Sequence, residues 1–354
     1  MRVELPERLR RVLPDAAQAF RAPGRANLIG EHTDYNDGFV LPVALELATW
    51  IAGRPRANGV VSVRSLEGDI QRHVDAVAGA LRDAEIEVHG FDGLVTSDLP
   101  IGAGLSSSAA LEVALACALG GAGLEPSRLA ALCQRAENVY LGTRSGIMDQ
   151  LASAAGQAGH ALLIDCRDLT VTPVPFPSSL SVLVIDSAVR RELAESGYNE
   201  RVSQCQAAAE ALGVRSLRDT SPAQVESLSG VLLRRARHVV EENRRVLAAA
   251  EALRAERLDE LGHLFRASHA SLAHDFEVST PELDALVAIA EETDGVVAAR
   301  LTGAGFGGCT VNLVRDEAAE AGGRTVVERY RQETGREARS WVSKPAQGAG
   351  PVPV

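Results

Sequence analysis

The segment from Pro23 to Tyr35 places an arginine and then three polar residues of different chemistry within a short run that glycines punctuate. The candidate functional side chains are Arg25, Glu31, His32 and Asp34. Carboxylates accept hydrogen bonds and an imidazole can donate or accept them, so this set can hold a ligand rich in hydroxyl groups, such as a sugar. A lone histidine is also a common structural residue, and this alternative stays open for His32.

A second segment combines glycines with a run of serines just before an apolar helix pattern at residues 109–119. We call residues 99–108 the serine loop; its candidate anion-binding members are Gly102, Ala103, Gly104, Leu105, Ser106, Ser107 and Ser108. Glycine lets successive N–H groups point at one spot, and the first turn of a helix adds unpaired N–H groups with partial positive charge. The pattern indicates a site for phosphates. Serine is also a favoured helix N-cap, which is the alternative role.

A third glycine-rich segment, residues 301–309, precedes a strand-like run at residues 310–314. We call it the late glycine loop. Its four glycines allow close backbone approach to another group, although a simple bend at the end of a strand would need the same residues. Alanine tolerates the left-handed region poorly, so Ala304 is expected at negative φ.

The first segment closely resembles the signature of galactokinases, within the GHMP superfamily of small-molecule kinases that includes homoserine, mevalonate and phosphomevalonate kinases. The serine loop and the late glycine loop are similar to segments shared across that superfamily, in the same order. The resemblance covers residues from about 20 to 345. It implies an α+β fold of two domains, a ribosomal-protein-S5-domain-2-like N-terminal domain and a ferredoxin-like C-terminal domain. It also implies that the late glycine loop closes the active site.

The resemblance further implies the catalytic residues. Residues 146–150 look like the galactokinase segment that carries the catalytic aspartate, here Asp149, beside the anomeric hydroxyl of the sugar. Asp149 would take the hydroxyl proton or orient the hydroxyl for attack on the γ-phosphate, and Arg25 would pair with it and steady the transferring phosphoryl group. Without the resemblance, a cap of the helix that follows would be the favoured role of Asp149.

The remaining site residues also follow from the resemblance. Asp34 is expected on ring hydroxyls and Glu31 toward the hydroxymethyl group. The implied sugar-binding set is Glu31, His32, Thr33, Asp34, Gly146 and Tyr198. Ser65 joins the serine loop as a nucleotide contact. The segment around Tyr198 departs from the family pattern in one respect, because Val202 follows Arg201 where a second arginine is usual.

The resemblance implies Mg²⁺ as cofactor, held by Ser108 and Glu137. Mg²⁺ prefers oxygen ligands and keeps several waters, which suits one hydroxyl, one carboxylate and a nucleotide's phosphates. An exposed position on a helix is the alternative for Glu137.

Composition excludes several other classes of protein. The chain has 354 residues, 46% hydrophobic and 23% charged, with a net charge of −11, which argues against nucleic acid or an anionic membrane as partner. Its single lysine, Lys344, leaves no residue for a Walker-type loop, a protein-kinase strand lysine or a Schiff base. Five widely spaced cysteines without a Cys-x-x-Cys pair, and no signal pattern, predict free thiols and a cytoplasmic protein.

The hydrophobic pattern predicts a mixed front half and a helix-rich rear half with late strands. Residues 1–180 are expected to form an N-terminal domain that carries the sugar segment, the serine loop and Asp149. Residues 181–345 are expected to form a C-terminal domain with the late glycine loop, and residues 346–354 a disordered tail.

The resemblance therefore implies ATP-dependent phosphorylation of D-galactose at its anomeric hydroxyl, the first committed kinase step of the Leloir pathway, by a monomer. A kinase for a related sugar, such as N-acetylgalactosamine, arabinose or a uronic acid, remains the nearest alternative. Some fungal relatives are non-catalytic sugar sensors that lack a Ser-Ala pair after the glycine loop. Here Ser108 and Ala109 keep that pair, which argues against a sensor.

Overall fold

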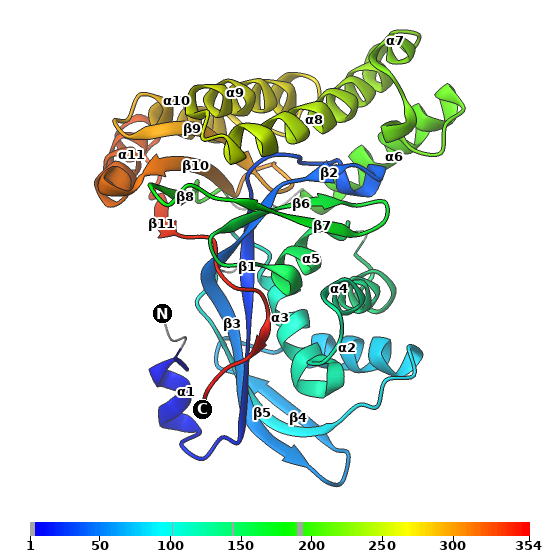
Figure 1. Ribbon diagram of the computed structural model, residues 1–354, viewed down its shortest axis with the longest axis vertical. Helices are drawn as coiled ribbons and strands as arrows, with labels where there is room; N and C mark the ends of the chain where they lie inside the picture. The colour runs from blue at the N-terminus through cyan, green and yellow to red at the C-terminus, as the bar shows by residue number, and fades with distance from the viewer. Residues whose placement is uncertain (1–3, 101, 144, 190–193) are drawn as a thin grey trace.

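The computed structural model describes residues 4–100, 102–143, 145–189 and 194–354. A five-stranded sheet forms one half of the molecule (Figure 1). Its strands, in spatial order, are β12 (Gly350–Pro351), β1 (Gln18–Asn27), β3 (Pro42–Arg56), β5 (Gly90–Ser97) and β4 (Val61–Ser65). All pairings are antiparallel except that of β4 with β5.

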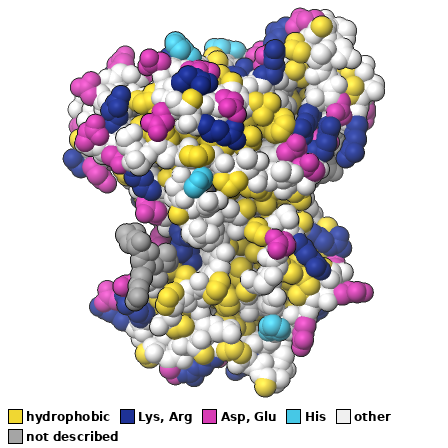
Figure 2. Space-filling view, in the orientation of Figure 1, with side chains coloured by type: hydrophobic (Ala, Val, Ile, Leu, Met, Phe, Trp, Pro, Cys, Tyr) yellow, Lys and Arg dark blue, Asp and Glu magenta, His cyan; other side chains and the backbone are white. Residues whose placement is uncertain are grey.

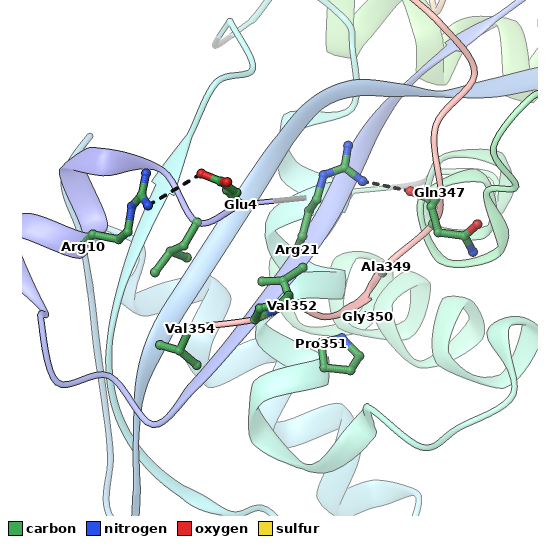
Figure 3. A pocket seen from close by; sticks show the side chains of 12 residues that line it. Glu4, Arg10, Arg21, Gln347, Ala349, Gly350, Pro351, Val352 and Val354 are labelled. Carbon is green, nitrogen blue, oxygen red and sulfur yellow. Dashed lines mark hydrogen bonds and ion pairs between the residues drawn. The ribbon is translucent and has the colours of Figure 1, made fainter. Parts of the chain in front are cut away.

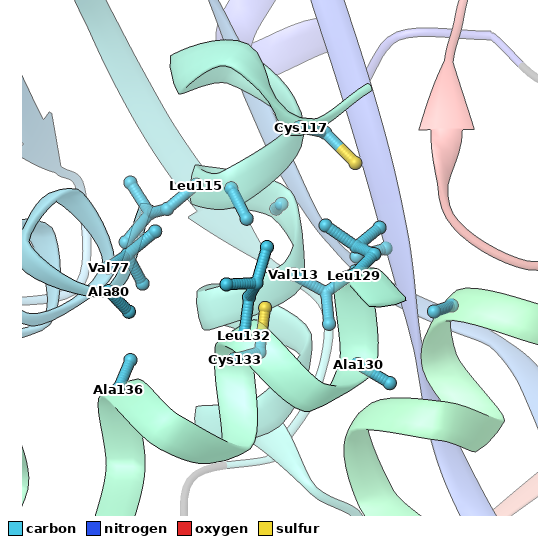
Figure 4. Packing of buried hydrophobic residues seen from close by; sticks show 14 of the residues in the cluster. Val77, Ala80, Val113, Leu115, Cys117, Leu129, Ala130, Leu132, Cys133 and Ala136 are labelled. Atoms are coloured by element: carbon cyan, nitrogen blue, oxygen red, sulfur yellow. The ribbon is translucent and has the colours of Figure 1, made fainter. Parts of the chain in front are cut away.

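Helices cover one face of this sheet, and their apolar residues form the core of this half of the molecule (Figure 4). They are α2 (Gln71–Asp83), α3 (Ser107–Ala116), α4 (Pro126–Arg135) and α5 (Met148–Ala155), with single-turn π-helical continuations at η2 (Cys117–Gly121) and η3 (Ala136–Leu141). Val113 and Leu115 of α3 are fully buried against α2 and α4. Short α1 (Glu7–Val12) lies near the C-terminus of the chain.

A second sheet forms the other half (Figure 1). Its order is β11 (Arg339–Ser343), β8 (Leu180–Asp186), β10 (Cys309–Arg315) and β9 (Val296–Thr302), all antiparallel. Its helices are α6 (Ala194–Leu212), α7 (Pro222–Val225), α8 (Gly230–Arg254), α9 (Leu258–His274), α10 (Pro281–Glu291) and α11 (Ala319–Thr334), with one-turn 3₁₀ helices η4 (Leu217–Asp219) and η5 (Asp316–Ala318).

A three-stranded sheet lies between the two halves (Figure 1). It consists of β2 (Phe39–Val40), β6 (His160–Asp165) and β7 (Thr170–Pro175). The 3₁₀ turn η1 (Asp34–Asn36) precedes β2 and carries Asp34. The predicted domain boundary falls within one residue of the start of β8, and it stays a prediction.

The prediction of a disordered tail at residues 346–354 is wrong. The backbone N–H groups of Ala346 and Gly348 donate to Ala44 O and Gly156 O, and β12 pairs with the outer edge of β1. Arg21 Nη1 also donates to Gln347 O at 2.9 Å. The tail covers the edge of a strand that would otherwise be unpaired. A cavity of about 660 Å³ lies between the tail and α1 (Figure 3).

Among the described residues, no single helix has the length and hydropathy of a membrane span, although one bent pair meets these criteria jointly. The pair joins residues 107–121 to 126–141 at an angle of 112°. On the face shown in Figure 2, acidic and basic side chains are intermingled.

Candidate active site

Arg25 and Asp149 lie far apart in the sequence and form an ion pair in the structure. Arg25 Nη2 lies 2.6 Å from Asp149 Oδ1, and Nε donates to the same oxygen at 2.8 Å. The third nitrogen, Nη1, donates to Gly104 O of the serine loop at 2.7 Å. Arg25 is 5% exposed and the side chain of Asp149 is 31% exposed, so the guanidinium is shielded from water while the carboxylate stays accessible to a ligand.

Gly24 allows Arg25 to reach this position. The pairing of β1 with β3 shifts register between Pro23 and Arg25, which marks a β-bulge, and bulges re-aim side chains near functional sites. A Cβ on Gly24 would lie 2.3 Å from Leu99 Cδ2 and 2.6 Å from Leu105 O. Glycine therefore lets the strand and the serine loop approach closely.

The second oxygen of Asp149 binds the serine loop. Ser106 Oγ donates to Asp149 Oδ2 at 2.6 Å. Asp149 lies in the first turn of α5, where the N-cap is Ile147 and no side chain makes a capping bond. The alternative that Asp149 is a helix cap is therefore wrong. The cap alternative for the serines holds for the position of Ser106, which is the N-cap residue of α3, but its side chain makes no capping bond and binds Asp149 instead.

Asp34 approaches the same place from the first motif. A Cβ built on Gly146 would lie only 1.7 Å from Asp34 Oδ2, so Asp34 packs directly on the backbone that leads to Asp149. Burial, and then the negative charge of Asp149, raises the pKa of Asp34 to about 6. The structure thus brings together Arg25, Asp34, Gly146 and Asp149, as predicted.

Tyr198 of α6 joins these residues from the other half of the chain. Its ring lies 5.7 Å from the ring of His32 and 5.5 Å from that of Tyr35, measured between centroids. Burial, followed by the charges of Asp34 and Asp149, holds the pKa of the Tyr198 hydroxyl well above its usual value. The phenol therefore stays neutral and can donate a hydrogen bond.

His32 is held by both of its ring nitrogens. Nε2 lies 3.2 Å from Ala304 O, which can only accept, so Nε2 carries the proton and Nδ1 accepts from the Tyr35 hydroxyl at 2.9 Å. Burial, and then the charge of His238, lowers the pKa of His32 to about 3, which agrees with a neutral ring. These contacts tie the first motif to the late glycine loop, and direct contact of His32 with a sugar stays a prediction.

Glu31 and Thr33 are also engaged within the protein. Glu31 Oε1 accepts from Gly303 N at 3.0 Å, and Oε2 forms an ion pair with Arg300. The Thr33 hydroxyl lies 2.7 Å from Phe39 O and 2.8 Å from Gly30 O. Their predicted sugar contacts stay predictions, because the visible role of both side chains is to fix the loop that carries Asp34.

The serine loop has the backbone of an anion-binding turn. Gly102, Gly104 and Ser106 have φ of 77°, 83° and 59°, and Ala103 and Leu105 are buried as anchors beneath them. Ser107 is half-buried and Ser108 is exposed at the start of α3. Ile101 lies outside the described residues.

Ser65 ends strand β4. Its Cα pairs in register with Val95 of β5, two residues before that strand ends and the chain enters the serine loop. Ser65 Oγ lies 3.0 Å from Glu67 Oε2. Its predicted contact with a nucleotide is untested and stays a prediction.

Three family descriptions match the chain. Residues 11–55 match the "Galactokinase galactose-binding signature", residues 72–157 the "GHMP kinases N terminal domain" and residues 249–332 the "GHMP kinases C terminal". The galactokinase of Roseiflexus sp. (strain RS-1) is 47% identical, over 94% of this chain and 92% of the relative. Human galactokinase is 43% identical, over 96% of each chain.

This chain belongs to the galactokinase family. The crystal structure of Lactococcus lactis galactokinase complexed with galactose superposes with a TM-score of 0.90 at 33% identity, over 97% of each chain. Methanococcus jannaschii mevalonate kinase, with a TM-score of 0.67 at 19% identity, shares the fold. The predicted α+β GHMP kinase fold of two domains is confirmed.

The residues of this galactokinase-family chain fit Mg²⁺ as a partner of bound phosphates rather than as a resident ion. No group of three or more His, Cys, Asp or Glu in the described part of the chain could hold a metal. Glu137 is half-buried in η3, not exposed, and Ser145 Oγ and Gln150 Nε2 both bind its Oε2. If Mg²⁺ took one carboxylate oxygen and the exposed hydroxyl of Ser108 as ligands, phosphate and water oxygens would fill its other coordination positions, as Mg²⁺ prefers.

Sequence reasoning missed a buried charge network beneath the first motif. Arg300 of β9 and Glu242 of α8 are both fully buried; Glu242 Oε1 accepts from Gly30 N at 3.0 Å and Oε2 accepts from Arg245 Nε at 2.6 Å. Burial opposes ionisation of Glu242, but the charges of Arg245, His238 and Arg300 outweigh it and lower its pKa to about 2. The signal was available, because an arginine interrupts the otherwise apolar strand Val296–Thr302.

Proposed function

We propose that this chain transfers the γ-phosphoryl group of ATP to the anomeric hydroxyl of D-galactose, giving α-D-galactose 1-phosphate and ADP. The observation that carries the proposal is the junction of Asp149, Arg25 and Ser106 beside Asp34, in which Arg25 and Asp34 belong to the galactokinase signature. It unites a carboxylate, a shielded cation and a phosphate-type loop, which are the parts that phosphoryl transfer needs.

The proposed roles follow from the contacts. Asp34, Gly146 and Tyr198 surround the place where Asp149 lies, so they can hold the sugar with its anomeric hydroxyl against the Asp149 carboxylate. Asp149 takes the proton of that hydroxyl or orients it, as Arg25 and Ser106 fix the carboxylate. Glu31, His32 and Thr33 are proposed as further sugar contacts and as supports of the loop.

The serine loop and Ser65 are proposed to receive the nucleotide. The N–H groups at the start of α3 offer hydrogen bonds to phosphate oxygens. Arg25 adds positive charge beside the serine loop, because its guanidinium donates to Gly104 O of that loop. Mg²⁺, held by Ser108 and Glu137, would neutralise charge on the phosphates when bound. We further propose that the protein is a cytoplasmic monomer acting at the first kinase step of the Leloir pathway; the buried thiols of Cys117, Cys133, Cys166 and Cys205 are compatible with a reducing compartment.

The test is ADP release from Mg-ATP across a panel of galactose, N-acetylgalactosamine, glucose, arabinose, galacturonate and mevalonate. Strong turnover with galactose supports the proposal. Turnover with another sugar alone would keep the mechanism and change the substrate. Galactose binding without turnover by any sugar would contradict a kinase and indicate a sensor.

Galactose affinity is expected to fall as the pH drops below about 6. The pKa of Asp34 is raised to about 6, so below that pH the carboxyl is protonated and loses acceptor capacity for sugar hydroxyls. KM for galactose should then rise by up to about tenfold per pH unit, while KM for ATP changes less. Steady-state kinetics from pH 5 to 8 measure this, with Asp34→Asn as the variant whose pH profile should be flat. A galactose KM that does not change between pH 5 and 7 would contradict the assignment.

Gly146→Ala is expected to raise KM for galactose by about 10- to 100-fold, the worth of one hydrogen bond to a charged group. The new Cβ would need the space of Asp34 Oδ2, so the Asp34 carboxylate must move. The matched control is Gly123→Ala, where a Cβ meets nothing within 4 Å. Equal galactose KM values for the two variants would show that Asp34 does not need its present position.

A further inference from the structure

Two buried polar residues behind the candidate metal carboxylate take no part in the mechanism above. Glu112 of α3 and Gln150 of α5 are both fully buried, on helices whose other buried side chains are apolar except for Ser153. Burying a carboxyl and an amide is costly unless their hydrogen bonds are made, so their presence needs an explanation.

Gln150 connects Glu112 to Glu137. Its Nε2 donates to Glu137 Oε2 at 2.7 Å and to Glu112 Oε2 at 3.2 Å. Ser145 Oγ donates to the same oxygen of Glu137. Both donors therefore engage Oε2, and within the described residues no donor engages Glu137 Oε1, which leaves it available to a cation on the nucleotide.

The other oxygens of the two buried groups lack donors. Glu112 Oε1 and Gln150 Oε1 are buried acceptors without a partner among the described residues. A proton on Glu112 removes both deficits, because the acid O–H can donate to the amide carbonyl while the amide N–H donates to the acid. Burial, and then the charge of Glu137, raises the pKa of Glu112 to about 9, which agrees with a neutral carboxyl at physiological pH.

The direction of the Gln150 amide decides what Glu137 meets. With its nitrogen toward Glu137 the amide donates to the carboxylate; with its oxygen there, two acceptors would face each other. The bonds of the amide nitrogen to Glu137 and Glu112 favour the first orientation, and a donor on Glu112 adds a bond to the amide oxygen. Glu112 thus fixes the amide, and the amide fixes Glu137.

We propose that Gln150 and Glu112 are positioning residues that orient Glu137 Oε1 toward the metal of the bound nucleotide. This inference rests on the proposed kinase function, since it concerns the carboxylate assigned to the metal. It gives a role to two residues that do not touch the substrate: Glu112 lies outside the motifs, and Gln150 is the last residue of segment 146–150.

The test is the affinity of the full chain for Mn²⁺ at a fixed, saturating concentration of ADP, measured by electron paramagnetic resonance of the free ion. Gln150→Met and Glu112→Leu are each expected to weaken Mn²⁺ binding by about tenfold or more, the usual cost of losing a group that orients a metal ligand. Glu112→Gln should stay within about twofold of the parent, because a second amide can donate to and accept from Gln150 as the acid does.

Two results would overturn the proposal. One is a Glu112→Gln variant as weak as Glu112→Leu, which would mean that the charge of Glu112 acts directly. The other is parental Mn²⁺ affinity in all three variants. Thermal unfolding of each variant separates lost binding from lost folding. Failure of the kinase proposal would show separately, as a parent that binds Mn²⁺ and ADP but releases no ADP with any sugar.

Discussion

Asp149→Asn is expected to lower kcat for galactose phosphorylation by about a thousandfold, within the range that general base catalysis contributes. The amide keeps the size of the side chain but cannot take the hydroxyl proton. It also loses the charge that pairs with Arg25 at 2.6 Å and accepts from Ser106. Galactose binding should stay within a few-fold of the parent, because Asp34, Gly146 and Tyr198 remain. Steady-state kinetics and isothermal titration calorimetry measure the two quantities separately.

The matched control is Asp259→Asn, which changes an exposed carboxylate in the first turn of α9. It should leave kcat unchanged. The size of the loss at Asp149 also distinguishes its two possible roles. An asparagine can still orient a hydroxyl through its carbonyl oxygen, so a variant that keeps more than about a tenth of kcat would contradict proton transfer to Asp149.

The local motifs could be read from the sequence because each is a short run with its own backbone demand. The glycines of the serine loop and of the late glycine loop adopt the positive φ angles that these turns require. Ala304 has the negative φ that was predicted. Phe306 was not anticipated, because an aromatic residue at a φ of 58° is unusual. Its N–H donates to Val278 O at 2.7 Å, a contact from another segment that holds it there.

The pairing of distant segments could not be read from the sequence in the same way. Strand β7 contains two prolines and is mostly exposed, so it carries little of the alternating pattern that marks a strand. The tail is rich in glycine and proline, and composition predicts disorder. Its order comes from backbone bonds to β1 and from Arg21, which do not depend on the tail's own side chains.

In the candidate site, too, the sequence predicted the local motifs but not the contacts between distant segments. The resemblance supplied the residue types, but it could not tell that His32 and Glu31 bind the late glycine loop through Ala304 O and Gly303 N. Such contacts join elements about 270 residues apart, and their formation depends on how the two halves pack. The first motif therefore has a supporting role that its sequence does not reveal.

Replacing Arg300 with methionine is expected to lower the free energy of unfolding by about 3–5 kcal/mol, the usual cost of removing one partner of a buried ion pair. Arg300 pairs with Glu31, lies 3.8 Å from Glu242 Oε1, and donates to Leu28 O at 3.0 Å. Without it, two fully buried carboxyl groups would face each other beneath the sugar-binding motif. Chemical denaturation of the purified variant measures the change.

The control is Arg329→Met, which removes a partly exposed arginine from its pair with Glu292 on the surface. Such a pair is worth about 0–1 kcal/mol, so this variant should unfold near the parental denaturant concentration. Adding Glu31→Gln to Arg300→Met should restore part of the lost stability, because it removes a charge that the first change leaves buried and unpaired. Equal midpoints for Arg300→Met and Arg329→Met would show that the buried network does not hold the two halves of the active site together.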